Sequence, residues 1–292
     1  MKSFTINELE KLSGIKAATI RVWERRYQLF EPSRSSGNVR IYSFRDLEII
    51  LPIALLTKNG YRISTISNST LPSLKNTIKR IADDVLQWEH ATNQLVVHMY
   101  HSQVTSFAEF LDELLIAWNI NILVEKILAP FLFTSGLLWK ENHWDEVRLV
   151  LPAIRNKLIL AIETLPNTSS PSFTAVLFLP DKKQLDLGLL YANYVLKKCS
   201  GKIIYLGNNI NLQHLKYVID IKQPHFLFTY LFPNHPFKIP ELLKIIKESS
   251  PASVLLVSTY SSVMTGKSIS KNFRQLPLLE ALDFMQNGLA LA

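Results

Sequence analysis

The chain has 292 residues, 48% of them hydrophobic, with 32 Lys+Arg against 24 Asp+Glu. This length fits two or three domains, the composition excludes a wholly disordered chain, and the single cysteine, Cys199, excludes both an internal disulfide framework and a cysteine-rich zinc site. The chain starts without an apolar secretory segment, and no apolar stretch reaches the ~20 residues of a membrane span, so we expect a soluble, cytoplasmic protein with no membrane partner.

Positive charge is concentrated near the N-terminus. Residues 1–80 hold 14 Lys+Arg and 6 Asp+Glu, whereas the numbers of basic and acidic residues are equal in the remaining chain. A small basic module joined to a neutral body is typical of a protein that binds a polyanion.

The first two predicted helices form a recognisable motif. Thr5 can cap the first helix, with Glu8 as the partner of a capping box. A turn at Gly14 leads to a second helix over residues 17–27, in which Trp23 is expected to pack into the core. Two short helices joined by a glycine turn predict a helix-turn-helix, whose second helix enters the major groove of DNA.

A basic β-wing is predicted to follow. Residues 32–42 contain a Gly37-Asn38 turn between two short extended arms. Ser43 then caps another helix, with Asp46 three residues further on.

The run TIRVWERRYQLFEPSRSSGNVRIYSFRDL resembles the winged helix-turn-helix of MerR-type transcription regulators. The resemblance covers about residues 3–70. Its matching residues are Thr19, Arg21, Trp23, Glu24, Arg25, Tyr27, Leu29, Pro32, Arg34, Arg40, Tyr42 and Asp46. It implies a dimer that binds double-stranded DNA at a pseudo-palindromic operator.

Nine residues are predicted to contact DNA. Arg21 and Arg25 are expected to reach base edges, because arginine pairs well with guanine. Near the start of the same helix, Lys16 and Thr19 are expected to reach bases or phosphates, while Glu24 holds an arginine in place. Outward-facing Arg26 and the wing residues, which clamp the DNA backbone, complete the set: Arg34, Asn38, Arg40 and Tyr42.

The middle segment, residues 74–168, reads as a bundle of four or five helices. One helix is predicted through Ile78 and Leu86. His98 and His101 are three residues apart, but no carboxylate or cysteine is well placed beside them, so we expect no metal site.

Strands and helices alternate in residues 172–292. Apolar runs predict strands over residues 175–179, 203–206, 226–230 and 254–258, with helices over 187–198, 212–221 and 239–248. This pattern predicts a Rossmann-like, doubly wound parallel sheet. The fold class is therefore multidomain α and α/β, with a winged helix-turn-helix over residues 1–73, followed by the helical bundle and the sheet domain.

The order of these three parts resembles the cobalamin-binding photoreceptor repressors of the MerR superfamily. That family carries an Asp/Glu-x-His-x-x-Gly motif whose histidine ligates cobalt, then Ser-x-Leu, Gly-Gly, and in the bundle Trp followed by Glu-His. Here the residues at the matching positions form a degenerate pocket: Trp139, Leu149, Val150, Leu185, Gly188, Thr229, Leu231, Ser258 and Thr259. Leu185 replaces the histidine and has no lone pair for cobalt, Ser258-Thr259 replaces Gly-Gly, and Leu149-Val150 replaces Glu-His. Because three separate contact points have lost their chemistry, we expect no cofactor, although His143 or His214 could ligate instead.

The leading hypothesis is a non-enzymatic, DNA-binding transcriptional regulator, a repressor that forms a homodimer or tetramer and does not depend on cobalamin. Its body senses a regulatory protein or a small-molecule effector. The alternative is a cobalamin-binding repressor that responds to light or the vitamin through non-standard ligation. A cobalamin-dependent enzyme is the third hypothesis, but such an enzyme has no use for a winged helix-turn-helix.

Overall fold

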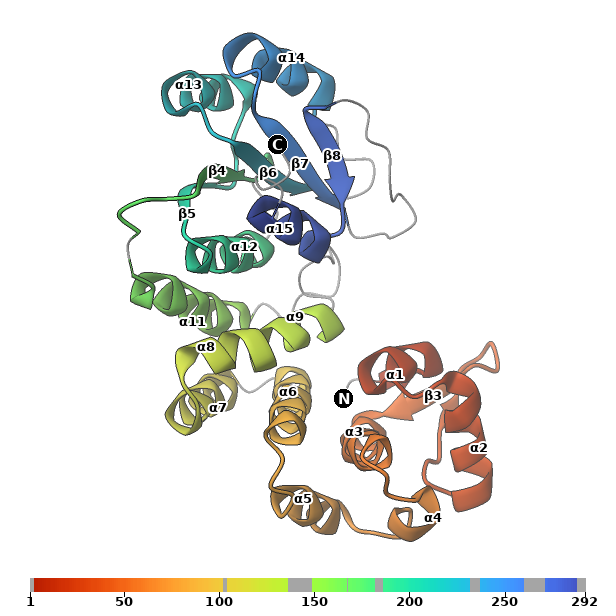
Figure 1. The fold of residues 1–292 in the computed structure, drawn as a ribbon. Coiled ribbons are helices and arrows are strands. Elements are labelled where there is room, and N and C mark those ends of the chain that lie inside the picture. The colour runs from red at the N-terminus through yellow and green to blue at the C-terminus, as the bar shows by residue number, and fades with distance from the viewer. Residues whose placement is uncertain are drawn as a thin grey trace. The chain divides into compact units, whose positions relative to one another are not determined.

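The computed structural model describes residues 3–101, 104–135, 149–166, 168–181, 186–231, 237–259 and 271–287. The chain forms two compact units, Met1–Ile154 and Arg155–Ala292 (Figure 1). The boundary falls inside helix α11, Leu151–Thr164, so the three domain ranges expected from the sequence remain a prediction. No helix in the described ranges is long and apolar enough to cross a membrane.

The first unit begins with a winged head. A three-stranded antiparallel sheet with the order β1-β3-β2 joins the N-terminal strand to the wing. The elements of the head are β1 (Ser3–Thr5), α1 (Ile6–Ser13), α2 (Ala17–Tyr27), β2 (Ser33–Arg34), β3 (Arg40–Ser43), α3 (Phe44–Lys58) and α4 (Ile63–Ile66).

Local signals at the helix ends are those that the sequence predicts. The Thr5 and Ser43 side chains each complete a capping box, with Glu8 and Asp46 respectively. Gly14 ends α1 in the left-handed region at φ 72°, which a glycine adopts without strain. The predicted turn between α1 and α2 is confirmed.

The rest of the first unit is helical, with one break that the sequence analysis did not predict. Its elements are α5 (Leu71–Lys79), α6 (Asp84–Tyr100), α7 (Val104–Ala117), α8 (Ile120–Ile122), the π-helical η1 (Leu123–Leu128) and α9 (Ala129–Ser135). The single helix predicted through Ile78 and Leu86 is wrong. The Asp83 carboxylate accepts from the Leu86 N–H and starts α6 as a new helix.

One hydrophobic core joins the head to the first helices behind it. Trp23 of α2, Leu55 of α3, Leu74 of α5 and Leu86 of α6 are all buried in the same cluster. The head therefore packs on these helices instead of hanging from a free linker.

The second unit is a five-stranded sheet whose strands are all parallel, in the order β5-β4-β6-β7-β8. After α11, its elements are β4 (Phe173–Phe178), α12 (Leu187–Lys198), β5 (Gly201–Gly207), α13 (Leu212–Lys222), β6 (Phe226–Leu231), α14 (Ile239–Ser249), β7 (Val254–Thr259), β8 (Phe273–Leu276) and α15 (Leu278–Asn287). The predicted doubly wound parallel sheet is confirmed. Strand β8 and helix α15 are not among the elements predicted from the sequence.

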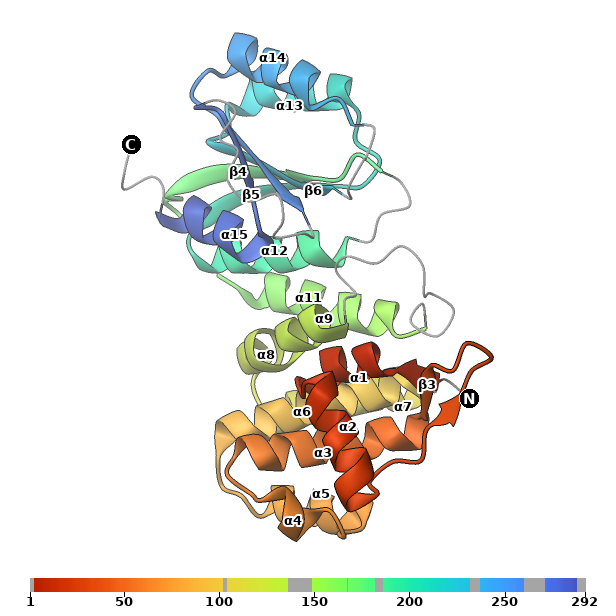
Figure 2. The same cartoon turned by 90° about the vertical axis from the view of Figure 1, so that its right-hand side faces the viewer.

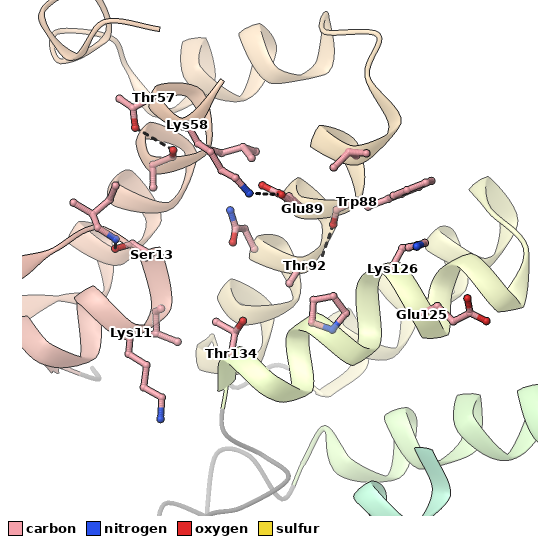
Figure 3. A pocket seen from close by; sticks show the side chains of 18 residues that line it. Lys11, Ser13, Thr57, Lys58, Trp88, Glu89, Thr92, Glu125, Lys126 and Thr134 are labelled. Carbon is pink, nitrogen blue, oxygen red and sulfur yellow. Dashed lines mark hydrogen bonds and ion pairs between the residues drawn. The ribbon is translucent and has the colours of Figure 1, made fainter. Parts of the chain in front are cut away.

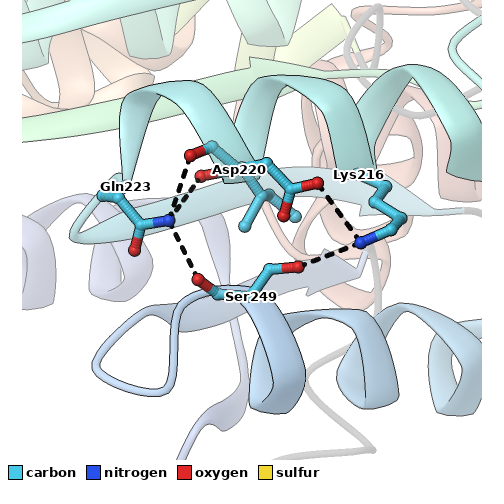
Figure 4. Close-up of polar contacts among 5 residues, drawn as sticks. Lys216, Asp220, Gln223 and Ser249 are labelled. Carbon is cyan, nitrogen blue, oxygen red and sulfur yellow. Dashed lines mark hydrogen bonds and ion pairs between the residues drawn. The ribbon is translucent and has the colours of Figure 1, made fainter.

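Helices cover both faces of this sheet, with α12 and α15 on one side and α13 and α14 on the other (Figure 2). Polar contacts join α13 to α14 (Figure 4). Lys216 donates to Asp220 at 3.2 Å and to the Ser249 hydroxyl at 3.3 Å, and the Gln223 amide donates to the Ser249 carbonyl at 2.9 Å. The apolar face beneath these two helices is filled by a buried cluster that includes Phe178, Leu227 and Leu255.

Candidate nucleic-acid interface

Helix α2 separates an apolar face from a basic one. Ile20 is fully buried and Trp23 is 7% exposed, which confirms the prediction that Trp23 is a core residue. Arg21, Arg25 and Arg26 are exposed. Arginines on the solvent side of a packed helix give a rigid, positively charged surface that fits the major groove.

The start of α2 is held by an acidic residue that the sequence analysis missed. Glu10 of α1 accepts from the Ala17 backbone N–H at 2.9 Å and from Lys16 Nζ at 3.1 Å. These two contacts lower the pKa of Glu10, with the Ala17 hydrogen bond as the larger cause. A carboxylate at a helix N-terminus also suits the helix dipole. Lys16 is exposed but paired, and Thr19 is partly buried.

The wing adds an exposed arginine, Arg34, to those of α2. Asn38 adopts φ 59° in the turn between β2 and β3, and its N–H donates to the Ser35 carbonyl at 2.9 Å. The Asn38 side-chain oxygen accepts from Arg34 Nη1 at 2.6 Å. Arg34 and Arg40 face each other across the two strands. Asn38 therefore orients Arg34 at the tip of the wing.

Glu24 connects α2 to the wing. Its carboxylate accepts from Arg40 Nε at 3.0 Å and from the Tyr42 hydroxyl at 2.9 Å. The prediction that Glu24 holds an arginine is confirmed. The hydrogen bond from Arg40 to Glu24 raises the pKa of the guanidinium. The pKa of Tyr42 is also raised, with burial as the largest cause and the hydrogen bond to Glu24 as the next.

This arrangement corrects the expectation for Tyr42. Its side chain is fully buried, so it has no surface to offer a DNA backbone, and it supports the wing from inside. The aromatic body is apolar and only the hydroxyl needs a polar partner, which Glu24 supplies. Arg40 is partly buried in its ion pair with the same carboxylate. The exposed members of the predicted set are Lys16, Arg21, Arg25, Arg26, Arg34 and Asn38.

The residues of the degenerate pocket are only partly described. Trp139 and Leu185 lie outside the described residues, and Leu149 and Val150 belong to the first unit. Gly188 opens α12 and is buried, and Thr259 ends β7.

Two buried hydroxyls lie at the carboxyl ends of neighbouring strands of the sheet. Thr229 of β6 and Ser258 of β7 are fully buried. Within the described residues, neither hydroxyl has a hydrogen-bond partner. A buried hydroxyl without a partner is costly, so these two atoms mark places where a ligand could supply the missing bonds. Ligands of doubly wound sheets bind at this edge.

A charged cluster that the sequence did not predict lies at the start of α12, between the pocket positions Leu185 and Gly188. The Asp186 carboxylate accepts from Arg155 Nη2 at 3.1 Å and from the Tyr205 hydroxyl at 3.0 Å. Burial and the Asp186 charge raise the pKa of Tyr205. Asp186 directly follows the position of Leu185 and precedes Gly188, so the spacing of the degenerate motif was the signal that could have found it. Within the described residues, no group of histidine, cysteine and carboxylate side chains could hold a metal ion.

The N-terminal part of the chain matches a known protein family. Residues 4–70 match the MerR HTH family of regulatory proteins, and this part of the chain is a MerR-type helix-turn-helix domain. Over 236 residues the chain is 25% identical to the HTH-type transcriptional repressor CarH of Myxococcus xanthus, covering 77% of this chain and 78% of CarH. It is 26% identical over 207 residues to the HTH-type transcriptional repressor CarA of the same organism, covering 69% and 67%.

The N-terminal part of the chain thus carries a MerR-type helix-turn-helix, and the chain is homologous to CarH and CarA over most of its length. The solved structure of the monomethylamine corrinoid protein of Methanosarcina barkeri covers 68% of this chain and 99% of that chain, with a TM-score of 0.53 and 13% identity. This likeness shows that the two proteins share a fold.

The expectation that the chain takes no cofactor is wrong. It depended on three changed contact points: Leu185 in place of the histidine, Ser258-Thr259 in place of Gly-Gly, and Leu149-Val150 in place of Glu-His. The homology to CarH and CarA, together with the fold shared with a corrinoid protein, overturns that expectation.

Proposed function

We propose that the chain is a transcriptional repressor that binds a pseudo-palindromic DNA operator through α2 and the wing. The observation that carries the proposal is the exposed arginine face of α2, whose other face is fixed in the core by Ile20 and Trp23. The relatives CarH and CarA are named as repressors, which supports both the direction of regulation and a non-enzymatic role.

The proposed mechanism assigns separate roles to helix and wing. Arg21 and Arg25 contact base edges, because a guanidinium can donate two parallel hydrogen bonds to guanine O6 and N7. Arg34 contacts phosphate, which adds affinity without sequence preference. Glu24 fixes the wing against α2 through Arg40, so both sets of contacts form together. A two-fold dimer presents two such heads to the two halves of the operator.

The roles of helix and wing are tested with single variants of the full chain. An operator is first selected from random DNA, and gel-shift titrations then compare matched and scrambled sites. Arg25→Gln is expected to cost about 1–3 kcal/mol on the matched site and to relax base preference. Arg34→Gln should weaken binding to all DNA alike and reduce the slope of log affinity against log salt by about 1.

The exposed Arg80, at the end of α5, provides the control. Arg80→Gln should leave both affinity and preference unchanged. The proposal is contradicted by a selection that enriches no sequence, or by an Arg25→Gln protein that matches Arg80→Gln on both sites.

We also propose that the second unit takes a corrinoid. Support comes from the fold shared with a corrinoid protein and from the unpartnered hydroxyls of Thr229 and Ser258, which would bond polar groups of the ligand. A bound corrinoid would supply a cobalt centre. Since leucine has no lone pair, Leu185 would give cobalt no ligand, and Thr229 and Ser258 would hold the corrinoid through its polar groups.

Corrinoid binding is tested by incubating the full chain with hydroxocobalamin or adenosylcobalamin in the dark and removing the free compound. The chain should retain a stoichiometric amount in its absorbance spectrum and melt at a higher temperature, because a ligand that binds only the folded state stabilises it. Thr229→Val should weaken retention, whereas Thr174→Val, at the opposite end of the sheet on β4, should not. An uncoloured protein with an unchanged melting temperature would contradict the proposal.

A further inference from the structure

A cavity of about 870 Å³ lies in the first unit, beside the helix-turn-helix (Figure 3). The turn between α1 and α2 and the C-terminal half of α3 form one side of it. The opposite side comes from α6, η1 and α9. In Figure 3, Lys11 and Ser13 lie on one side and Glu125 and Lys126 on the other. Its volume is within the range of small-molecule sites, ~300–1,000 Å³.

Trp88 of α6 lines the cavity and carries an unused hydrogen-bond donor. The indole Nε1 is buried, and no acceptor in the described part of the chain lies within hydrogen-bond distance of it. Leaving a buried N–H without an acceptor costs about 1–3 kcal/mol, so the free protein carries a penalty that an incoming acceptor would remove.

Positive charge lies beside this donor. Lys126 Nζ is 6.0 Å from the centre of the Trp88 ring, so the ammonium and the indole N–H are close enough to serve one ligand group. Four other charged residues line the wall. Lys58 of α3 donates to Glu89 of α6, and Lys11 and Glu125 lie on opposite sides of the cavity and each have a partner. The Thr92 hydroxyl also has a hydrogen-bond partner, because it donates to the Trp88 carbonyl at 3.0 Å.

The remaining wall is largely aliphatic. Leu12 and Ile15 line it from the helix-turn-helix, and Leu55 and Pro130 line it from the helices behind. Concave apolar walls with a few placed polar groups are typical of sites for small organic molecules.

We propose that this cavity is an effector site for a small amphipathic anion, such as an aromatic or branched carboxylate. The apolar body packs on the indole and the aliphatic wall. The anionic oxygens accept from Trp88 Nε1 and lie near Lys126.

The position of the site links the ligand to DNA affinity, and this step depends on the proposed function. Ser13–Ile15 directly precede α2, so a ligand that touches this turn and α6 together restrains the recognition helix relative to the helices behind it. A ligand that favours one arrangement of the head must change DNA affinity, and DNA must change ligand affinity by the same factor.

The site is tested by fluorescence titration of the full chain with two probes that differ in one charged group. Anilinonaphthalene sulfonate is the anion and N-phenylnaphthylamine is its neutral analogue. The anion should bind with a stoichiometry of one per chain and more tightly than the neutral probe. Trp88→Phe keeps an aromatic ring but removes the donor, and should weaken the anion about tenfold. Trp118→Phe, at a tryptophan outside the cavity wall, is the control.

A second pair of variants avoids any disturbance of packing. Val85 lines the cavity and is 57% exposed, and Ile116 of α7 is 88% exposed outside it. Val85→Glu should weaken the anion and spare the neutral probe, while Ile116→Glu should change neither. The proposal is overturned if the anion does not bind, if neither Trp88→Phe nor Val85→Glu weakens it, or if its binding is lost as protein concentration rises, which would assign the cavity to a second copy of the chain.

The link to DNA has its own readout. The anion should shift the affinity for the selected operator, and the operator should shift anion affinity equally. A bound anion with no effect on operator affinity overturns the coupling alone. If the chain binds no DNA, the proposed function fails, and the titrations with Trp88→Phe and Val85→Glu still decide the effector site.

Discussion

At the scale of single residues, burial in the first unit changes the pKa of a histidine, His90. His90 of α6 is partly buried close to α5, and burial, with smaller contributions from Lys75 and Lys79, lowers its pKa to about 4. The folded chain therefore holds this imidazole neutral at pH values where an unfolded chain would protonate it.

This difference predicts a pH-dependent stability. Above pH 6.5, His90 is neutral in both states and the free energy of unfolding is at its full value. As the pH falls from about 6.5 to about 4, the unfolded chain binds a proton at His90 that the folded chain does not, and the free energy of unfolding falls by up to ~3 kcal/mol. His90→Gln should flatten that part of the curve in urea unfolding experiments. His214→Gln, at an exposed position in α13, should keep it. Equal curves for wild type and His90→Gln would refute the assignment.

At the scale of elements, Glu24 is the contact that makes α2 and the wing one body. Its carboxylate is bonded by Arg40 and by the buried hydroxyl of Tyr42, and both belong to β3. Removing the carboxylate would leave that hydroxyl without an acceptor.

Glu24→Ala should therefore destabilise the first unit by about 1–3 kcal/mol and weaken DNA binding, because the wing is no longer fixed to the recognition helix. Thermal unfolding and gel shift are the measurements. Glu31→Ala, an exposed carboxylate in the same head, should cost little. A Glu24→Ala protein as stable as Glu31→Ala would show that the Glu24 contacts do not hold the wing.

The sequence predicts most of these elements because their signals are local. Helix α12 begins and ends at the predicted residues, Leu187 and Lys198, and the strands β4 to β7 follow apolar runs. The break between α5 and α6 depends on one cap, Asp83, inside a continuous apolar pattern. Strand β8 is four residues long and includes Arg274, so it lacks the apolar signal that identified the other strands.

The candidate site is predicted less completely than the elements, because part of it depends on contacts between elements that are distant in the sequence. Residue types alone identify the arginines of α2 as exposed cations, since Ile20 and Trp23 fix which face is buried. They do not say that Tyr42 points inward or that Glu10 reaches Ala17, because both depend on contacts between separate elements. The cavity wall is drawn from five elements, and no single stretch of sequence carries its signal.

At the scale of the whole molecule, the basic surface and one proposed ligand site belong to the first unit, and the other proposed ligand site belongs to the second. The basic head belongs to the first unit, with an adjacent cavity that contacts the turn before α2. At the carboxyl edge of the parallel sheet in the second unit, the Thr229 and Ser258 hydroxyls have no partner among the residues that the structure describes. We infer a regulator with two distinct ligand inputs, one beside the DNA-reading helix and one at the sheet.

If the chain recognises a DNA sequence, it must bind a selected operator more tightly than a scrambled site of equal length. At one fixed salt concentration near physiological, the ratio of the two affinities should be about 10³ or more. A ratio near one at that salt concentration would contradict sequence recognition, because the basic head would then bind DNA through charge alone.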